Sequence, residues 1–520
     1  MIKLEKVLSF GNECNTFLST VQDEKFHHFK NIKMNLYKRD YKIKAKNSNK
    51  IVDADYIIAK ILEEVKKEAI KQIKYSIKDL NKNNIHWVIT VPAIWDVKSK
   101  QVMINAAQKA GLIRDDDDPS NFFALEPEAA SIYYHNSPQG MKNEDIDSGK
   151  PFILCDLGSG TADIVTQKKV VRDREIKFEE LYPPIGGDCG CNQININFME
   201  RVIKKLFGKE CFEETEKNVS ENNYYDWFEF ENRIEEFKKN YKKIDQKDKR
   251  FRIDCEIFKY YCKEDLEKLI NNFNSNNESW ELKIETGWKI LFPYRIINDL
   301  MQELINKIKK EYLSQIMESI NKIETLVFTG GASASPILFD MIQNFKDLNI
   351  KNYVASVNPE VAIAFGPVLY SFDHYIISPR KSKYTFGIKT SDIWDNKRHI
   401  KGGIKIYDKL DKIYRCKNSF TRFIQKNENL RPFDEISHKF TMNNSKANVQ
   451  LYKTEKDNAT FCDEEGVTLF GEFIIDVENH KFDKSNKVVE VKMKMGGTFI
   501  SASAIYCKTG DKFKLTCLYE

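Results

Sequence analysis

The stretch Asp156-Leu157-Gly158-Ser159-Gly160-Thr161-Ala162-Asp163 is the most informative segment of this chain for its fold. It follows the apolar run Phe152–Cys155, which is typical of a buried strand, and it continues into the apolar pair Ile164 and Val165. Two glycines around one small residue predict a tight strand–turn–strand. Successive backbone N–H groups in such a turn can point at one spot and bind an anion such as phosphate.

The side chains of this turn add to the same prediction. Asp156, at the end of the strand, is placed to hold a hydrated Mg²⁺, an ion that prefers to keep several of its waters. Thr161 supplies a hydroxyl donor. The alternative for these eight residues alone is an ordinary glycine-rich hairpin in which Asp156 is a turn residue.

A second glycine-rich turn lies about 170 residues further on, at Thr329-Gly330-Gly331-Ala332-Ser333-Ala334-Ser335-Pro336. It follows the apolar strand Leu326–Phe328, and Pro336 stands where a helix favours proline, at its first position. Backbone amides and the helix dipole can meet a ligand there, although a plain strand-to-helix turn is the alternative. Two such turns, each after an apolar strand, suggest two lobes that face one nucleotide.

The rest of the chain predicts an α/β body and a β-rich tail. Apolar spacing indicates a long helix over 50–85, a strand over 87–91 and a helix over 98–110. Residues 190–320 are expected to be mostly helical. Beyond about residue 380 the period becomes two, as where Val489, Val491 and Met493 alternate with charged residues, and this indicates half-buried antiparallel strands.

Composition narrows the class of protein. The 520 residues correspond to roughly three to four domain-sized units, and 41% hydrophobic with 31% charged residues is typical of a globular chain. A net charge of +5 argues against a nucleic-acid binder. We expect no membrane association, because no segment approaches the ~18 apolar residues of a span. The N-terminus lacks the apolar stretch of a secretory signal, so we expect a cytoplasmic protein.

The eleven cysteines show no CxxC pair. Only Cys189 and Cys191 are closely spaced, and no histidine lies nearby to complete a zinc set. We therefore expect reduced and mostly buried thiols.

Several motifs together resemble the actin-like ATPases of the 70-kDa heat-shock family. Trp87–Trp95, Ala106–Leu112 and Leu125–Ala130 are similar to that family's first connecting segment, and Asn358–Gly366 to its second. The two glycine-rich turns match its second phosphate motif and its adenosine motif in order and spacing. The Gly-Gly turn at 186–191 is similar to the one that enters the family's upper lobe.

Within this family, the chain most resembles the divergent branch of the heat shock 70 kDa protein 12 type. Two further stretches support this, Phe29–Tyr37 and Arg380–Gly387. The resemblance is strong over 86–378 and weaker at both ends and over 190–320. It implies a two-lobed, ribonuclease H-like ATPase domain with lobe I at 1–150 and lobe II at 151–378. Residues 190–320 would form a helical upper subdomain, and 380–520 a β-rich, substrate-binding-like domain without a helical lid.

The resemblance also implies roles for individual residues, with ATP or ADP and Mg²⁺ as cofactors. Asp156 would lie near the Mg²⁺ shell and contact the ion through water, and Glu126 would orient the attacking or a metal-bound water. Lys33 aligns loosely with the family's catalytic lysine, and a surface lysine is the alternative. The β- and γ-phosphates would be held by Gly158, Ser159, Gly160 and Thr161. Gly330, Gly331 and Ala332 would pass under the ribose and adenine. Glu235, Lys238 and Lys239 would form the far wall of the adenine pocket, unless they belong to a solvated amphipathic helix.

Some features of the family are missing from the sequence. Residues 1–50 contain no match to its first phosphate motif, of the Asp-x-Gly-Thr-Thr kind, so we expect lobe I to be incomplete at its N-terminus. Ile376–Arg380 replaces the acidic, leucine-rich linker. We therefore expect an ATP-binding, heat-shock-70-like protein, a divergent chaperone for extended or unfolded peptides whose ATP hydrolysis is weak or absent. The alternative is a non-catalytic interaction or scaffold protein on the same fold, and a sugar kinase would not explain the β-rich tail.

Overall fold

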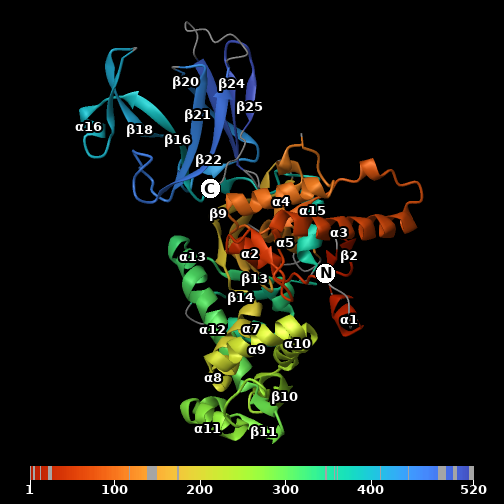
Figure 1. The fold of residues 1–520 in the computed structure, drawn as a ribbon. Helices are drawn as coiled ribbons and strands as arrows, with labels where there is room; N and C mark the ends of the chain where they lie inside the picture. The colour runs from red at the N-terminus through yellow and green to blue at the C-terminus, as the bar shows by residue number, and fades with distance from the viewer. Residues whose placement is uncertain are drawn as a thin grey trace.

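The computed structural model describes the chain except for residues 1, 4, 5, 12, 21–25, 116, 138–148, 173, 174, 346, 347, 357, 360, 410, 443, 478–487, 496–499 and 515–520. It is a mixed α/β protein with several sheets, as predicted (Figure 1). The helices of residues 204–276, called here the distal helices, lie at one end of the molecule and the C-terminal strands at the other (Figure 1). Within the described ranges, no helix is both long and apolar enough to cross a membrane.

A five-stranded sheet forms the centre of the body, in the order β14-β13-β7-β8-β9. Its strands are β7 (Pro151–Leu157), β8 (Ala162–Arg172), β9 (Glu175–Gly187), β13 (Thr325–Thr329) and β14 (Asn352–Ala355). Strands β7 and β13 are parallel neighbours, with Asp156 opposite Thr329. The two glycine-rich turns that follow these strands therefore emerge side by side at one edge of the sheet.

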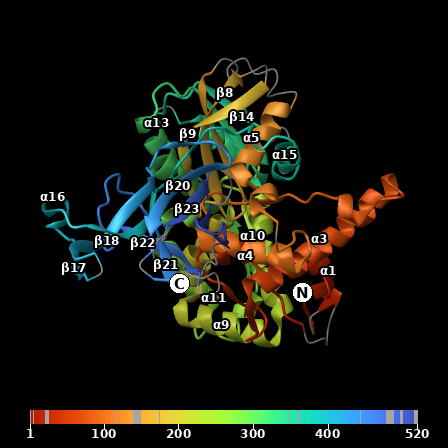
Figure 2. The ribbon, with the colours of Figure 1, turned by 90° about the horizontal axis from the view of Figure 1, so that it is seen from above.

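The first part of the chain forms helices and short strands. They are β1 (Ile2–Lys3), β2 (Lys6–Val7), α1 (Glu13–Thr20), α2 (Ile32–Tyr37), β3 (Lys42–Lys44), β4 (Ile51–Asp53), α3 (Ala54–Ser76), β5 (Ile89–Val91), α4 (Val97–Lys109), β6 (Phe123–Leu125) and α5 (Glu126–Asn136). Of these, β6 and α5 share a buried apolar cluster with the central sheet. Helix α15 (Ala362–Tyr370) packs closely on α5, because a Cβ at Gly366 would overlap the backbone of Ala129. Figure 2 shows α3 projecting on the side away from the C-terminal strands.

The region between β9 and β13 is only partly as predicted. Its helices are α7 (Asn192–Phe198), α8 (Lys204–Phe207), α9 (Lys209–Asn222), α10 (Tyr224–Asn240), α11 (Leu266–Asn276), α12 (Arg295–Ile308) and α13 (Ser314–Ser319). It also contains an antiparallel sheet in the order β10-β12-β11, made of β10 (Arg250–Asp254), β11 (Lys283–Thr286) and β12 (Lys289–Pro293). Helices make up most of the segment, as predicted, but this sheet was not predicted, because the alternation that buries Ile253, Ile290 and Phe292 extends over only a few residues.

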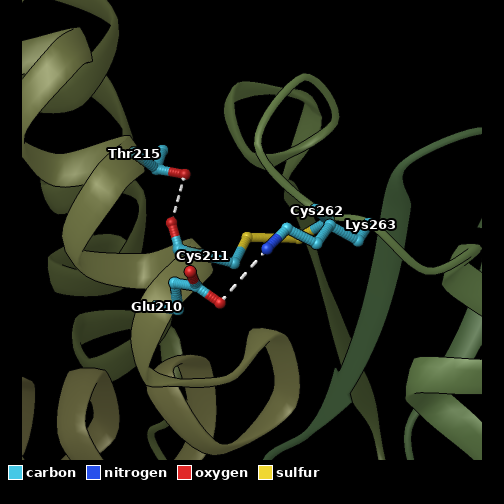
Figure 3. The surroundings of a disulfide bond; sticks show 5 residues. All are labelled: Glu210, Cys211, Thr215, Cys262 and Lys263. Carbon is cyan, nitrogen blue, oxygen red and sulfur yellow. Dashed lines mark hydrogen bonds and ion pairs between the residues drawn. A yellow bond between two sulfur atoms is a disulfide. The ribbon is translucent and has the colours of Figure 1, made fainter.

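A disulfide joins Cys211 of α9 to Cys262, with 5.3 Å between their Cα atoms (Figure 3). The expectation that all thiols are reduced was wrong for this pair. The cysteines are 51 residues apart, and the packing of α9 against the segment after β10 brings them together. Lys263 and Glu210 form an ion pair of 3.4 Å beside the bond.

The C-terminal strands form two sheets that share one apolar core. The first has the order β17-β18-β16-β21-β22 and the second β20-β23-β24-β25, while β15 pairs with β19. Their bounds are β15 (Arg380–Lys381), β16 (Thr385–Ile393), β17 (Lys405–Asp408), β18 (Ile413–Ile424), β19 (Asn429–Leu430), β20 (Asp434–Thr441), β21 (Lys446–Thr454), β22 (Val467–Asp476), β23 (Val488–Met495), β24 (Ser501–Tyr506) and β25 (Lys512–Lys514), with one short helix, α16 (Asn396–His399). Val489, Val491 and Met493 are buried, as their alternation predicts.

Polar contacts attach these strands to the α/β body. The guanidinium of Arg380 donates to both carboxylate oxygens of Glu128 in α5, at 2.5 and 2.8 Å, and both side chains are buried. Lys494 of β23 forms an ion pair of 2.6 Å with Asp118. The C-terminal strands and the body therefore meet in an interface that contains buried charge.

Candidate functional site

The two glycine-rich turns contact each other directly. Gly330 has φ +83° and ψ 160°, a conformation that is essentially restricted to glycine. A Cβ at this position would overlap Oδ1 of Asp156 and lie 2.5 Å from the carbonyl oxygen of Leu157. Glycine at 330 therefore allows the second turn to lie against the end of β7.

The first turn is held by the segment before α7. The amides of Gly190, Cys191 and Asn192 donate to its carbonyl groups at 2.8–3.2 Å. The amide of Gly158 donates to the carbonyl of Thr161 at 2.9 Å, so this N–H is already engaged inside the turn. Ser159 is exposed at its tip, and the side chain of Met34 lies over Gly160.

A cavity of about 560 Å³ opens between the two turns and α10. Of the residues predicted to bind nucleotide, seven line it: Gly158, Ser159, Glu235, Lys238, Lys239, Gly331 and Ala332. Gly160, Thr161 and Gly330 belong to the same turns but are not among the lining residues. The sequence prediction missed other parts of the wall, among them Tyr241, Lys242, Met301 and Ser335.

Charged side chains of α10 form one wall of this cavity. Glu235 accepts from Lys238 at 2.6 Å and from the amide of Asn195 at 2.6 Å, and it forms a longer ion pair of 3.4 Å with Lys239. Burial alone would raise the pKa of Glu235, but the charge of Lys238 and the hydrogen bonds together lower it by more. The net shift of the Glu235 pKa is therefore downward. The Glu-x-x-Lys-Lys spacing thus places all three side chains on one helix face.

A group of carboxylates lies where β7 ends and β8 begins, together with the first residue of α5. Glu126 is the first residue of α5, and its Oε2 accepts from Nζ of Lys33 at 2.6 Å. Asp163 is 1% exposed, and its Oδ1 accepts from the amide of Ala93 at 3.0 Å. Asp156 is also buried. Asp163 was not among the predicted site residues, although it closes the octapeptide that defines the first turn.

The electrostatics of this group are dominated by burial and like charge. Burial raises the pKa of Asp156 well above its usual range, and the charges of Glu126 and Asp163 raise it further. Burial also raises the pKa of Glu126 and of Asp163, although Lys33 lowers both. The charge of Lys33 is the one that opposes the rise at all three carboxylates, so the group carries excess negative charge when ionised.

These residues fit a hydrated divalent cation. Oδ1 of Asp156 and Oδ2 of Asp163 are buried and have no hydrogen-bond partner. Mg²⁺ is a hard cation that takes oxygen ligands and keeps its waters, so unpartnered carboxylate oxygens suit its hydration shell. Among the described residues, no three His, Cys, Asp or Glu side chains are grouped to bind a metal directly.

Comparison with known proteins gives two kinds of match. The family model described as Hsp70 protein matches residues 15–168. Heat shock 70 kDa protein 12A of Mus musculus is 23% identical over 577 aligned positions, which cover 98% of this chain and 83% of that protein. Heat shock 70 kDa protein 12B of Homo sapiens is 20% identical over 89% of this chain and 74% of its own length. A Chaperone protein HscA homolog of Acinetobacter baumannii is 32% identical, but this match covers 24% of this chain and 19% of that protein's length.

Proposed function

The comparisons support a divergent Hsp70-family protein of the heat shock 70 kDa protein 12 type, and on this premise we propose that the chain binds Mg²⁺-bound adenine nucleotide and acts as a chaperone with weak or absent ATP hydrolysis. In this proposal residues 1–150 and 151–378 are the two lobes of an actin-like ATPase domain. Residues 380–520 are the β-rich domain that contacts peptide.

One observation carries the nucleotide proposal. Two turns that are about 170 residues apart in the sequence line one cavity, together with the Glu-x-x-Lys-Lys face of α10. The volume of about 560 Å³ lies within the ~300–1,000 Å³ typical of small-molecule sites. A plain hairpin, a plain strand-to-helix turn and a solvated helix would not need to converge in this way.

The residues divide into two groups by the part of the nucleotide they would contact. Gly331, Ala332 and the α10 wall would contact the base and ribose, and no atom lies within 4 Å of a Cβ position at Gly331, which leaves open space there. Ser159, which lines the same cavity, would contact the phosphates. A bound Mg²⁺ would supply positive charge to the phosphates, and Asp156 and Asp163 would orient its waters.

Nucleotide binding can be tested with a matched pair of lysines. Lys238 lines the cavity and donates to the carbonyl of Cys191 at 3.2 Å, whereas Lys243 is exposed and is not part of the wall. In anisotropy titrations with a fluorescent ADP analogue and Mg²⁺, we expect Lys238→Met to weaken binding by about tenfold, which is about 1.4 kcal/mol. Lys243→Met should leave it unchanged. Equal affinities for both variants, or no saturable binding to the unaltered chain, would contradict the proposal.

The ion pair between Lys33 and Glu126, two candidate catalytic residues, supports slow hydrolysis. Phosphoryl transfer depends mainly on positioning and on stabilising charge. Lys33, whose charge acts on all three carboxylates, is held by Glu126 at 2.6 Å. Single-turnover phosphate release should therefore be close to that of Glu126→Ala. Phosphate release far above that of Glu126→Ala would show that Lys33 and Glu126 are competent for hydrolysis.

The peptide role rests on apolar side chains exposed around β16–β18. Ile393 is 66% exposed, and Ile404, Tyr407 and Tyr414 are also exposed on neighbouring segments. An extended peptide could add to the β17 edge and bury these side chains. Labelled apolar peptides should bind the full chain in anisotropy assays, and Ile393→Ser should weaken them. If Ile393→Ser leaves the peptide affinity unchanged, the peptide does not bind at the β17 edge.

A further inference from the structure

A second cavity, of about 580 Å³, lies among the distal helices. Its wall is formed by the end of α8, the start of α9, the segment 261–264 and one face of α11. None of its lining residues lines the cavity between the two glycine-rich turns. Its volume is within the ~300–1,000 Å³ typical of small-molecule sites, so it is large enough for a ligand of its own.

The disulfide bond is part of this wall, because both Cys211 and Cys262 line the cavity. Cys211 is 8% exposed and lies in the first turn of α9, where its carbonyl oxygen accepts from the hydroxyl of Thr215 at 2.7 Å (Figure 3). Cys262 is more exposed and lies outside the helices, between β10 and α11. A molecule in the cavity therefore reaches the disulfide most easily at Cys262.

The polar part of the wall carries charges of both signs. Three lysines and three glutamates line the cavity, namely Lys205, Lys209, Lys263, Glu210, Glu214 and Glu264. The ion pair between Lys263 and Glu210 lies beside the disulfide, and the two side chains are 79% and 81% exposed (Figure 3). Exposed pairs of this kind contribute only about 0–1 kcal/mol, so a ligand that carries both charges can exchange with them. This wall suits a zwitterion better than a simple anion or cation.

The remaining wall combines apolar side chains with amides. The apolar and aromatic lining residues are Leu206, Phe207, Tyr261, Leu269 and Phe273. Asn272, Asn276 and Asn277 also line the cavity, and their side chains have the donors and acceptors that match peptide groups. A ligand built like a short peptide would use the charged, the amide and the apolar parts of the wall together.

We propose that this cavity binds a small zwitterionic thiol of the cysteinyl-peptide class, and that the bound thiol exchanges with the disulfide and becomes attached to Cys262. The thiol first loses its proton to water, and its thiolate sulfur attacks Sγ of Cys262. A disulfide forms between the ligand and Cys262 while the bond to Cys211 breaks. The electron pair of the broken bond leaves on Sγ of Cys211, which takes up a proton from water.

This exchange needs no oxidant, because one disulfide bond replaces another. It releases the covalent connection between α9 and the segment that precedes α11, two parts of the chain that are 51 residues apart at the bond. The thiol of Cys211 can later attack the mixed disulfide at Cys262, which expels the ligand and restores the original bond. The inference does not depend on nucleotide binding, since the two cavities share no lining residue.

The exchange is tested on the full chain, in its disulfide form, with reduced glutathione as the probe. Samples are quenched with acid over time, and intact mass measurement and peptide mapping locate the adduct. Reduced glutathione forms a bond with a disulfide but not with a free thiol, so at early times the free cysteines stay unlabelled. We expect one glutathione per chain, on Cys262. An adduct on Cys211, or no adduct at any time, would overturn the proposal, as would a bond that opens only with a protein dithiol.

A comparison of thiols tests whether the cavity binds the ligand before exchange. At equal thiolate concentration, glutathione should open the bond about tenfold faster than the uncharged 2-mercaptoethanol, which corresponds to about 1.4 kcal/mol in the barrier. S-methylglutathione, which has the same charges but no thiol, should slow the reaction of glutathione. Equal rates for the two thiols, or no inhibition by S-methylglutathione, would refute binding in the cavity.

Paired substitutions then locate the binding site. Lys205→Met with Lys209→Met removes two lysines of the wall but keeps Lys263 beside the bond, so it should abolish the preference for glutathione. The matched control is Lys217→Met with Lys259→Met, at two exposed lysines outside the wall, and it should retain the preference. A preference that survives in the cavity variant, or that is lost equally in the control, would refute the proposed site.

Discussion

Replacing Gly330 by alanine should destabilise the α/β body, whereas the same change at its neighbour Gly331 should not. Gly330 has φ +83° and ψ 160°, and forcing another residue into this region costs about 1–3 kcal/mol. The added methyl would also overlap Asp156 and lie 2.5 Å from the carbonyl oxygen of Leu157. Relieving such overlap in a packed interior costs roughly another 1–3 kcal/mol. We therefore expect Gly330→Ala to lose about 2–6 kcal/mol, a large share of the ~5–15 kcal/mol of a typical domain.

Gly331→Ala is the matched control, because its backbone is not in the left-handed region and no atom lies within 4 Å of the added methyl. It should change stability by less than about 1 kcal/mol. Urea unfolding followed by tryptophan fluorescence and circular dichroism measures both variants. If Gly330→Ala unfolds at the same urea concentration as Gly331→Ala, then the two turns do not touch as described, and the geometry of the site is wrong.

Three further outcomes follow from charge and covalent structure. Burial raises the pKa of Glu180 to about 8, so the stability that its protonated form contributes is fully present below the ordinary carboxyl pKa and is lost as pH rises through 8. Between pH 5 and pH 8, urea unfolding should therefore show Glu180→Gln gaining about 3–4 kcal/mol in unfolding free energy relative to the unaltered chain. The pKa of Asp156 is raised in the same way, so bound Mg-ADP, which favours the ionised form, should stabilise the chain more as pH rises, and Asp156→Asn should flatten this dependence in thermal-shift titrations. Reducing the Cys211–Cys262 disulfide should cost the distal helices about 2–4 kcal/mol in unfolding experiments, with no response to reductant in Cys211→Ser.

The sequence predicted those parts of the site whose geometry is determined by residues close together in the chain. An apolar strand followed by Gly-Ser-Gly can be interpreted locally, and the structure has strand β7 ending at Leu157 immediately before that turn. The spacing of Glu235, Lys238 and Lys239 places them on one face of any helix. These features needed no knowledge of distant contacts.

The missed features depend on contacts between distant residues. The ion pair of Lys33 with Glu126 joins positions 93 apart, and the hydrogen bonds of Arg380 to Glu128 join positions 252 apart. Neither pairing leaves a periodic trace in the sequence. The same reason applies to the Cys211–Cys262 bond and to the sheet of β10, β11 and β12, whose strands alternate over only four or five residues.

Under the proposed function, the charge balance of the site would let nucleotide binding and hydrolysis separate. Burial of Glu126, Asp156 and Asp163 around Lys33 favours protonated carboxyls, and a hydrated Mg²⁺ bound with nucleotide would relieve the repulsion between the ionised forms. Binding would therefore gain from the excess of acids. Turnover would need the opposite, a free cation to stabilise charge on the transferred phosphoryl group, and Lys33 could act in this way only by leaving Glu126. Breaking a partly buried charge pair would leave Glu126 buried and unpaired, and this cost would add to the barrier of hydrolysis but not to the cost of binding.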